Sequence, residues 1–240
     1  MKKIHLETIG STNDYVKAHH RELVDFCYVQ ADRQTAGRGR LGREWLDQGG
    51  SALFSVILKS HLQPGMADQV PLVAAMAVHK TVSNYLMNAK IKWPNDIVVD
   101  GRKLAGILVE AIFEGDRLEA IVVGVGINVN NLAFPPELDG QAISMRMKTG
   151  REHKIDNVVD EVVKVFVLEI IHLLKGEIRY VDYGNKHSSL IGKWISFRQG
   201  NVPREGKALQ MTEDGSLLVD TGEETLRLRS GEVTLSTNEF

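Results

Sequence analysis

The chain has 240 residues, with 29 lysines and arginines against 31 aspartates and glutamates, and its formal net charge is −2. Hydrophobic residues make up 43% of the sequence, which excludes a disordered or fibrous chain. The near-neutral charge argues against a protein that coats nucleic acid or an anionic membrane. It does not exclude a basic site of limited size.

The single cysteine, Cys27, excludes an intramolecular disulfide and any zinc site built from several cysteines. It stands in the apolar stretch 26–29, so we expect it in the core rather than as a reactive thiol. Glycines and prolines interrupt the longest uncharged run, 120–136, which is therefore no membrane span. The N-terminus leads into no apolar signal core, so we expect a cytoplasmic protein with no membrane partner.

The order of apolar and polar residues predicts a mixed α+β fold. The predicted elements are a helix over 11–23, a strand over 26–31, a loop over 32–50, a strand over 51–58, a helix over 67–88, strands over 97–99, 104–113 and 118–127, and a helix over 156–175. Ser11 is the expected cap of the first helix, with Asp14 in the capping-box position. Short Asp-Gly and Glu-Gly-Asp turns join the three successive strands, which should therefore be antiparallel.

The pattern changes after residues 184–189 to short alternating segments separated by turns. These segments lie at 194–197, 208–211, 216–219, 225–228 and 232–235. They predict a small all-β unit of barrel type that leans on the rest of the chain, because about 50 residues bury little core alone. We therefore predict two domains, 1–187 with helices packed on a mainly antiparallel sheet, and 188–240 with the β-barrel.

The most unusual segment runs from Arg33 to Arg43, with four arginines, interleaved glycines and no acid. Forked arginine donors and closely approaching backbone N–H groups suit a phosphate or carboxylate, and Trp45 directly afterwards could stack on a base. A solvated basic loop and a nucleic-acid-binding module are alternatives. The glycines match the dinucleotide pattern G-x-G-x-x-G, but no strand leads into them and no apolar helix follows.

Three later segments carry further candidate contacts. Asn95 and Asp96 follow a Trp-Pro pair just before a strand, where side chains are held rigidly, although an Asx turn explains them equally well. Lys103 opens a strand beside small residues, where its ammonium could bridge a carboxylate and a phosphate, although an ordinary hairpin lysine is the simpler interpretation. Asn128 follows a strand with two glycines, which weaken a strand unless something must approach it closely.

The motifs of zinc hydrolases, serine hydrolases and P-loop NTPases do not occur in the sequence. Taken in order, Ser-Thr-Asn, Gly-Arg-Gly-Arg-x-Gly-Arg-x-Trp, Lys-Trp-Pro-Asn-Asp, Lys-Leu-Ala-Gly-Ile and Gly-x-Gly-Ile-Asn resemble the biotin protein ligases. The resemblance covers about 1–187 and extends to the tail. It implies a catalytic domain similar to class II synthetases, followed by a small SH3-like β-barrel.

The resemblance also implies a two-step reaction. Biotin and ATP form biotinyl-5′-AMP, and a lysine of a biotin carboxyl carrier protein then attacks this adenylate. Mg²⁺ is expected with ATP, but the sequence names no metal ligand. Lipoate ligases, which share the chemistry, are the nearest alternative. Only ten residues precede Ser11, so we expect the type without an N-terminal DNA-binding domain and no sequence-specific DNA binding. The sequence leaves open whether the chain forms a homodimer.

Site residues carried over from the family fall into three groups. Lys103 and Arg40 are the implied catalytic residues. The implied biotin contacts are Ser11, Thr12, Asn13, Gln34, Arg38, Gly39, Arg40, Lys103 and Gly106. The implied ATP and adenylate contacts are Arg38, Arg40, Arg43, Trp45, Asn95, Asp96, Lys103 and Asn128.

Overall fold

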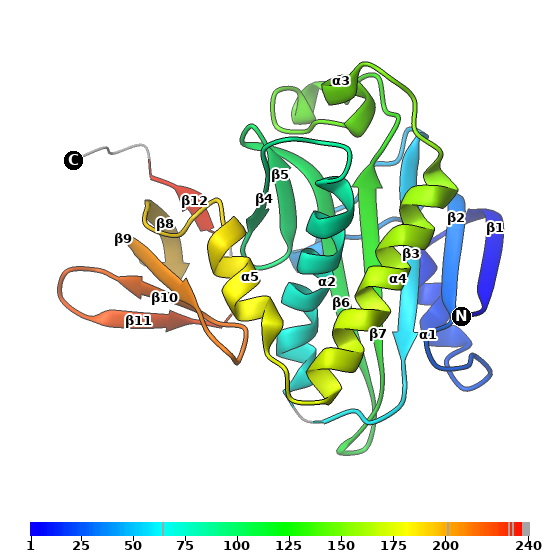
Figure 1. Ribbon diagram of the computed structural model, residues 1–240, viewed down its shortest axis with the longest axis horizontal. Coiled ribbons are helices and arrows are strands. Elements are labelled where there is room, and N and C mark those ends of the chain that lie inside the picture. Colours follow the sequence, from blue (N-terminus) through cyan, green and yellow to red (C-terminus); the bar gives the residue numbers. More distant parts are fainter. Residues whose placement is uncertain (64, 201, 230, 232, 237–240) are drawn as a thin grey trace.

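A seven-stranded sheet forms the larger part of the computed structural model, which describes residues 1–63, 65–200, 202–229, 231 and 233–236. The strands are β1 (Lys3–Ile9), β2 (Tyr28–Gln34), β3 (Ser51–Leu58), β4 (Ala89–Lys92), β5 (Asp96–Val99), β6 (Arg102–Glu114) and β7 (Arg117–Asn128). Their order is β1-β2-β3-β7-β6-β5-β4 (Figure 1). Only β1 and β2 pair in parallel, so the prediction of an α+β fold with a mainly antiparallel sheet is confirmed.

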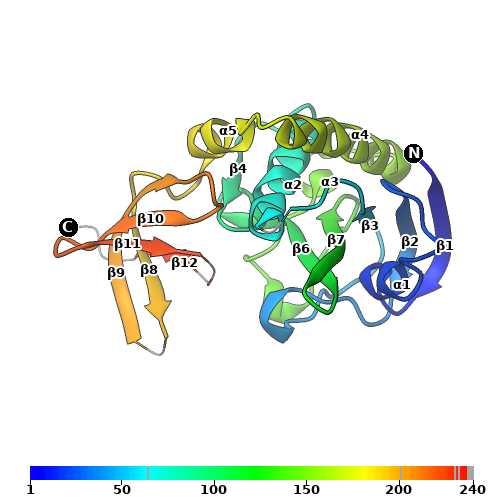
Figure 2. The same ribbon diagram turned by 90° about the horizontal axis from the view of Figure 1, so that it is seen from below.

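Helices cover both faces of this sheet unequally. They are α1 (Thr12–Ala18), α2 (Met66–Val82), α3 (Met145–Thr149), α4 (Ile155–Leu174) and α5 (Arg179–His187). The long helices α2 and α4 lie together on one face, and α1 lies on the other (Figure 2). Among the described residues, no helix combines the length and the apolar character that crossing a membrane requires.

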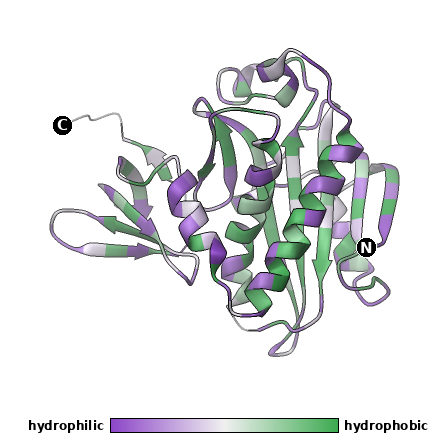
Figure 3. Cartoon of the chain, viewed as in Figure 1, coloured by the Kyte–Doolittle hydropathy of each residue, from purple (hydrophilic) through white to green (hydrophobic). Residues whose placement is uncertain are grey.

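The alternation of side chains along the central strands creates two different faces. In β3, Phe54 and Val56 join the main core beneath α2 and α4, whereas Ile57 packs with Val16 of α1. β7 alternates in the same way, with Val123 in the main core and Val122 in the α1 cluster. β3 is buried on both faces and is apolar except for Ser51 and Ser55, and Figure 3 also shows apolar residues at the centre of the sheet.

The predicted small β unit is a five-stranded antiparallel sheet. Its strands are β8 (Trp194–Gln199), β9 (Val202–Met211), β10 (Leu217–Asp220), β11 (Thr225–Leu228) and β12 (Val233–Leu235), in the order β11-β10-β9-β8-β12. Buried residues of this sheet, such as Phe197 and Met211, belong to the same apolar cluster as the core beneath α2. The tail therefore leans on the rest of the chain, as expected. The division into domains at 187 and 188 stays a prediction.

One turn of the tail docks against the main sheet and its helices. The indole Nε1 of buried Trp93 donates to the Gly215 carbonyl at 2.9 Å, and Gln69 Nε2 donates to the Glu213 carbonyl at 3.0 Å. The Tyr180 hydroxyl also donates to the Glu213 carbonyl. Three elements distant in sequence thus hold the same turn.

Several predicted bounds are wrong for local reasons. The first helix ends at Ala18, because the polar residues after it form turns in which Leu23 alone returns to the core. The helix expected over 67–88 ends at Val82, after which Asn88 adopts a left-handed φ of 67° and leads into the edge strand β4. The predicted loop over 32–50 is shorter than expected, since β2 continues to Gln34.

Substitution of Gly215 should loosen the docked turn. Gly215 has a φ of +81°, and an added Cβ would overlap the backbone oxygen of Asp68. Gly222 has a similar φ of +85° but no atom within 4 Å of such a Cβ, which makes it a matched control. We expect Gly215→Ala to lower the free energy of unfolding in urea by about 3 kcal/mol, and Gly222→Ala by about 1 kcal/mol. Equal losses would contradict the docking.

Candidate active site

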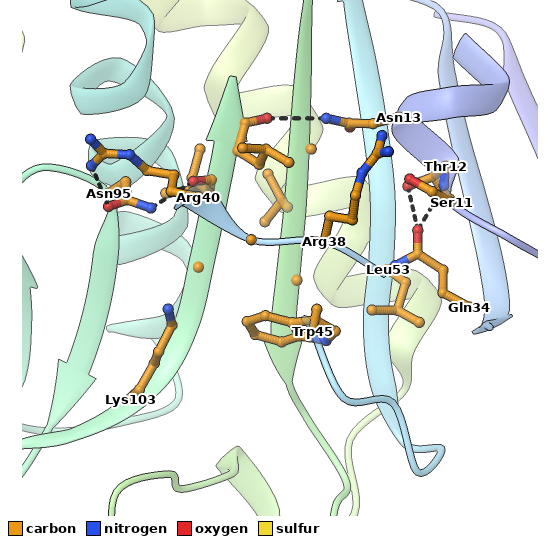
Figure 4. A pocket seen from close by; sticks show the side chains of 17 residues that line it. Ser11, Thr12, Asn13, Gln34, Arg38, Arg40, Trp45, Leu53, Asn95 and Lys103 are labelled. Carbon is orange, nitrogen blue, oxygen red and sulfur yellow. Dashed lines mark hydrogen bonds between the residues drawn. The ribbon is translucent and has the colours of Figure 1, made fainter. Parts of the chain in front are cut away.

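An open pocket lies on the α1 face of the sheet, over β3, β7 and β6 (Figure 4). Eleven of the fourteen predicted site residues line it: Ser11, Thr12, Asn13, Gln34, Arg38, Gly39, Arg40, Trp45, Asn95, Lys103 and Gly106. The period-two alternation of the strands explains the floor, because Leu53, Gly106 and Gly126 all stand on this face. Segments that are far apart in sequence therefore converge on one concave surface.

The three remaining residues lie outside the lining. Asp96 is paired with the Lys103 ammonium, and Asn128 donates to the Lys103 carbonyl at 3.4 Å. Arg43 is exposed at the end of the loop. Asp96, Asn128 and Arg43 thus each contact a residue of the lining without lining the pocket themselves.

The start of α1 builds one end of the pocket. The Ser11 hydroxyl caps the helix by accepting from the Asp14 N–H, as the capping-box pattern predicts. In the first turn, both the N–H and the hydroxyl of Thr12 donate to Gln34 Oε1, at 2.7 and 3.0 Å. Gln34 is the last residue of β2, so the helix start and the strand end fix each other.

A buried serine that sequence reasoning missed supports this end from below. Ser55 is 0% exposed, and its Oγ lies 2.6 Å from Asn13 Oδ1 and 2.7 Å from Thr12 Oγ1. The Asn13 amide donates in turn to Glu110 Oε2 at 2.7 Å. The signal for Ser55 was a polar residue within the apolar stretch of β3 that follows Ser51. The result is a donor- and acceptor-rich end of the pocket, in which the charge of Arg38 is balanced by Asp14, and we call it the neutral end.

Cationic groups occupy the opposite end, where Lys103 of β6 and Arg40 of the loop lie beside β5. The Lys103 ammonium lies 2.8 Å from Asp96 Oδ1 and 5.8 Å from the centroid of the Trp45 ring. Arg40 Nη1 donates to Asn95 Oδ1 at 3.1 Å, and the Asn95 amide donates to the Ile107 carbonyl at 2.7 Å. Figure 4 shows both cations beside the pocket, away from Gln34. An anionic ligand is therefore expected at this end.

Two glycines of β7 allow the side chains of Trp45 and Asn13 to lie directly against the floor of the pocket. A Cβ on Gly126 would lie 2.7 Å from the indole ring of Trp45, and a Cβ on Gly124 would overlap the Asn13 amide. The glycines in this strand are thus explained by close approach, as the sequence suggested. The buried Trp45 Nε1 has no hydrogen-bond partner within the described part of the chain.

The glycine- and arginine-rich loop over 37–45 folds back on itself above the pocket. Gly39 N–H donates to the Arg43 carbonyl at 2.7 Å, and Trp45 N–H donates to the Gly37 carbonyl at 2.9 Å. A short 3₁₀ turn, η1 (Arg40–Gly42), forms its tip. The loop therefore covers a pocket and is not a freely solvated basic segment. This placement weakens the nucleic-acid interpretation, because Arg38 and Arg40 line the pocket.

Comparison with known proteins agrees with this geometry. Residues 6–128 match the model of the Biotin/lipoate A/B protein ligase family. The mixed α+β fold described above agrees with this class of protein. The chain belongs to the Biotin/lipoate A/B protein ligase family.

Individual relatives extend the similarity beyond the matched segment. The bifunctional ligase/repressor BirA of Bacillus subtilis is 33% identical over 222 residues, which are 86% of this chain and 65% of that protein. The biotin--[acetyl-CoA-carboxylase] ligase of Mycobacterium tuberculosis is 28% identical over 93% of this chain and 85% of its own length. The structure of the Aquifex aeolicus biotin protein ligase in complex with biotin and ATP superposes with a TM-score of 0.86, at 28% identity and 98% coverage of both chains.

Removal of the Ser55 hydroxyl should cost stability at the neutral end. Ser55→Ala removes the Ser55 hydroxyl from Asn13 Oδ1 and leaves the Thr12 hydroxyl with Gln34 alone, so we expect the free energy of unfolding to fall by about 1–3 kcal/mol. Urea denaturation measures this change. Ser60→Ala, at an exposed turn, is the control and should stay within about 0.5 kcal/mol of the wild type. A neutral Ser55→Ala would show that the hydroxyl does not support the pocket.

Proposed function

We propose that this chain is an ATP-dependent biotin protein ligase. The observation that carries the proposal is the pocket itself, in which a neutral polar end and a cationic end face each other across Trp45. Biotin offers a neutral ureido ring and a carboxylate, and ATP offers phosphates and a base. The similarity to the Aquifex aeolicus ligase in complex with biotin and ATP, over 98% of both chains, supports the same ligands here.

The neutral end suits the ureido ring of biotin. A ureido group presents two N–H donors and one carbonyl acceptor, which call for hydroxyl and amide partners rather than charges. Ser11, Thr12 and Gln34 offer such partners around the pocket end. Two hydrogen bonds from Thr12 hold Gln34 in position, and Ser11 is held by the N–H of Asp14. Binding at this end directs the carboxylate of biotin toward the cations.

The cationic end suits the first reaction. An oxygen of the biotin carboxylate attacks the α-phosphorus of ATP, the bond to pyrophosphate breaks, and biotinyl-5′-AMP forms. Because this step brings like charges together, Lys103 and Arg40 lower its barrier by neutralising them. Asp96 and Asn95 orient these two cations through contacts of 2.8 and 3.1 Å. Trp45 is placed to stack on the adenine.

The second reaction needs no nucleophile from this chain. The amine of a lysine on a biotin carboxyl carrier protein attacks the carbonyl carbon of the adenylate, the bond to AMP breaks, and an amide forms. The mixed anhydride is already activated but also prone to hydrolysis. The loop over 37–45 is therefore proposed to exclude water until the carrier arrives.

A resident metal site is not apparent in the pocket. None of the residues that line it is a carboxylate, and the described chain contains no group of three acidic, histidine or cysteine side chains suited to a metal ion. Mg²⁺ is usually bound by substrate phosphates together with one or two carboxylates. We propose that any Mg²⁺ enters with ATP and is held mainly by phosphate oxygens, so no protein step depends on it.

Replacement of Lys103 should abolish adenylate formation in a folded protein. We expect Lys103→Ala to slow the release of pyrophosphate from biotin and ATP by about 10²–10³-fold, because one charge-stabilising group is lost. Unfolding in urea confirms that the variant is folded. Lys90→Ala removes an exposed lysine from β4 and should retain wild-type activity. Wild-type activity of Lys103→Ala would refute the proposed role.

The choice between biotin and lipoate tests the function directly. With ATP and carrier domains for each acid, we expect transfer of biotin and no transfer of lipoate, measured by the mass added to the carrier. The family also contains lipoate ligases, so the comparison is needed. Exclusive transfer of lipoate would overturn the proposed substrate while leaving the adenylate chemistry intact.

A further inference from the structure

The loop over 37–45 is attached to both sides of the pocket. On the side of β5, Arg40 donates to Asn95 at 3.1 Å, and both residues belong to the motifs already discussed. On the side of α1, Arg38 donates from Nη2 to Oδ1 of Asp14 and forms an ion pair with it. The second attachment depends on an acidic residue for which the sequence suggested only a capping position.

The geometry of α1 explains why Asp14 faces the loop. Ser11 caps the helix, the side chains of Thr12 and Asn13 enter the pocket, and Asp14 follows at the rim with 47% of its side chain exposed. Lys17, three residues further on, places its ammonium 3.1 Å from the same Oδ1 of Asp14. Two cations therefore share one carboxylate oxygen.

The contact continues from Lys17 into the floor of the pocket. Lys17 Nζ also lies 2.6 Å from Glu110 Oε1, and Glu110 Oε2 accepts from the Asn13 amide at 2.7 Å. Burial raises the pKa of Asp14, but the hydrogen bonds and positive charges of Lys17 and Arg38 hold it below its usual range. The carboxylate therefore stays ionised at neutral pH.

We propose that Asp14 is a positioning residue that tethers the loop over 37–45 above the pocket by holding Arg38. The proposal rests on the proposed function insofar as the covered ligand is biotinyl-5′-AMP. A guanidinium has five N–H donors, so the bond from Nη2 to Asp14 leaves others to meet the adenylate. The tether fixes the direction of Arg38 and keeps the loop closed between the two reactions.

The tether should be modest in strength and sensitive to salt. The side chains of Arg38 and Asp14 are 45% and 47% exposed, so water and ions screen the attraction between them. An ion pair of this exposure shifts an equilibrium by about two- to five-fold. A weak tether suits a loop that must open once for entry of substrates and again for the carrier lysine.

The first experiment tests the tether without any ligand. Trypsin cleaves after the arginines of the loop, and cleavage reports the fraction of molecules in which the loop is open. We expect Asp14→Asn to raise the loop cleavage rate by about two- to five-fold at low salt, with the difference from wild type vanishing at high salt. Asp32→Asn is the matched control, because Asp32 is 55% exposed and pairs with His5 away from the pocket.

The second experiment tests the consequence for the reaction. Biotinyl-5′-AMP is formed on the protein, and its release is followed after dilution. Asp14→Asn should release it about two- to five-fold faster, whereas Asp32→Asn should match the wild type. If Asp14 acts through Arg38, adding Asp14→Asn to Arg38→Gln changes neither the cleavage rate nor the release rate further.

The outcomes separate the tether from the proposed function. Cleavage of Asp14→Asn at the wild-type rate, or a further effect of Asp14→Asn in the Arg38→Gln background, overturns the tether. A wild-type protein that forms no adenylate refutes the proposed function, while the cleavage experiment still decides whether Asp14 holds the loop. Faster cleavage combined with unchanged adenylate release overturns the role of the tether in retention.

Discussion

The close approach of side chains to the backbone of β7 is the constraint on which the pocket depends. Gly124 faces the Asn13 amide and Gly126 faces the indole of Trp45, so a methyl group at either position would overlap its neighbour. The flanking residues of β7 that face α2 and α4 are branched and buried. One face of β7 therefore belongs to the core. On the other face the glycines carry no side chain, so Asn13 of α1 and Trp45 of the loop can lie against the strand backbone.

The positively charged side chains of the pocket are held in place by ion-pair and hydrogen-bond partners, and not by burial alone. Each cation at the reactive end has an oxygen beside it, Asp96 for Lys103 and Asn95 for Arg40. Asn95 and Asp96 are adjacent in sequence. Asp96 begins β5, which pairs with β6. A short stretch of sequence thus directs two positive groups at the same region, which is what charge stabilisation in a reaction requires.

Much of the pocket was predictable because its residues occur in short motifs with a chemical purpose. Thr12, Gln34 and Lys103 were carried over from the family whose motifs they match, and the fold brings them together in the pocket lining. Ser55 and Glu110 did not stand out, since their partners are Asn13 and Lys17, and those contacts depend on how α1 sits across the sheet.

Edge elements of the fold were harder to foresee for a related reason. The strands β1 and β4 are short or carry lysines, so their sequences alone fit a loop as well as a strand. The helix α5 contains Gly184 and has little apolar surface along its length, and it was not predicted. β4 and α5 form because packing against α2, and for α5 also against the tail, offsets weak local preference, whereas β1 is held by its pairing with β2.

The docked turn of the tail affects whether the five-stranded sheet can be separated from the rest of the chain in evolution. Trp93, which stands two residues before Asn95, gives its indole N–H to the Gly215 carbonyl, and Met211 joins the core beneath α2. Loss of the tail would remove the acceptor of the Trp93 indole N–H and expose apolar core close to Asn95. The five-stranded sheet is therefore not an exchangeable module. We therefore expect recombination that separates the five-stranded sheet from the larger sheet to yield unstable proteins.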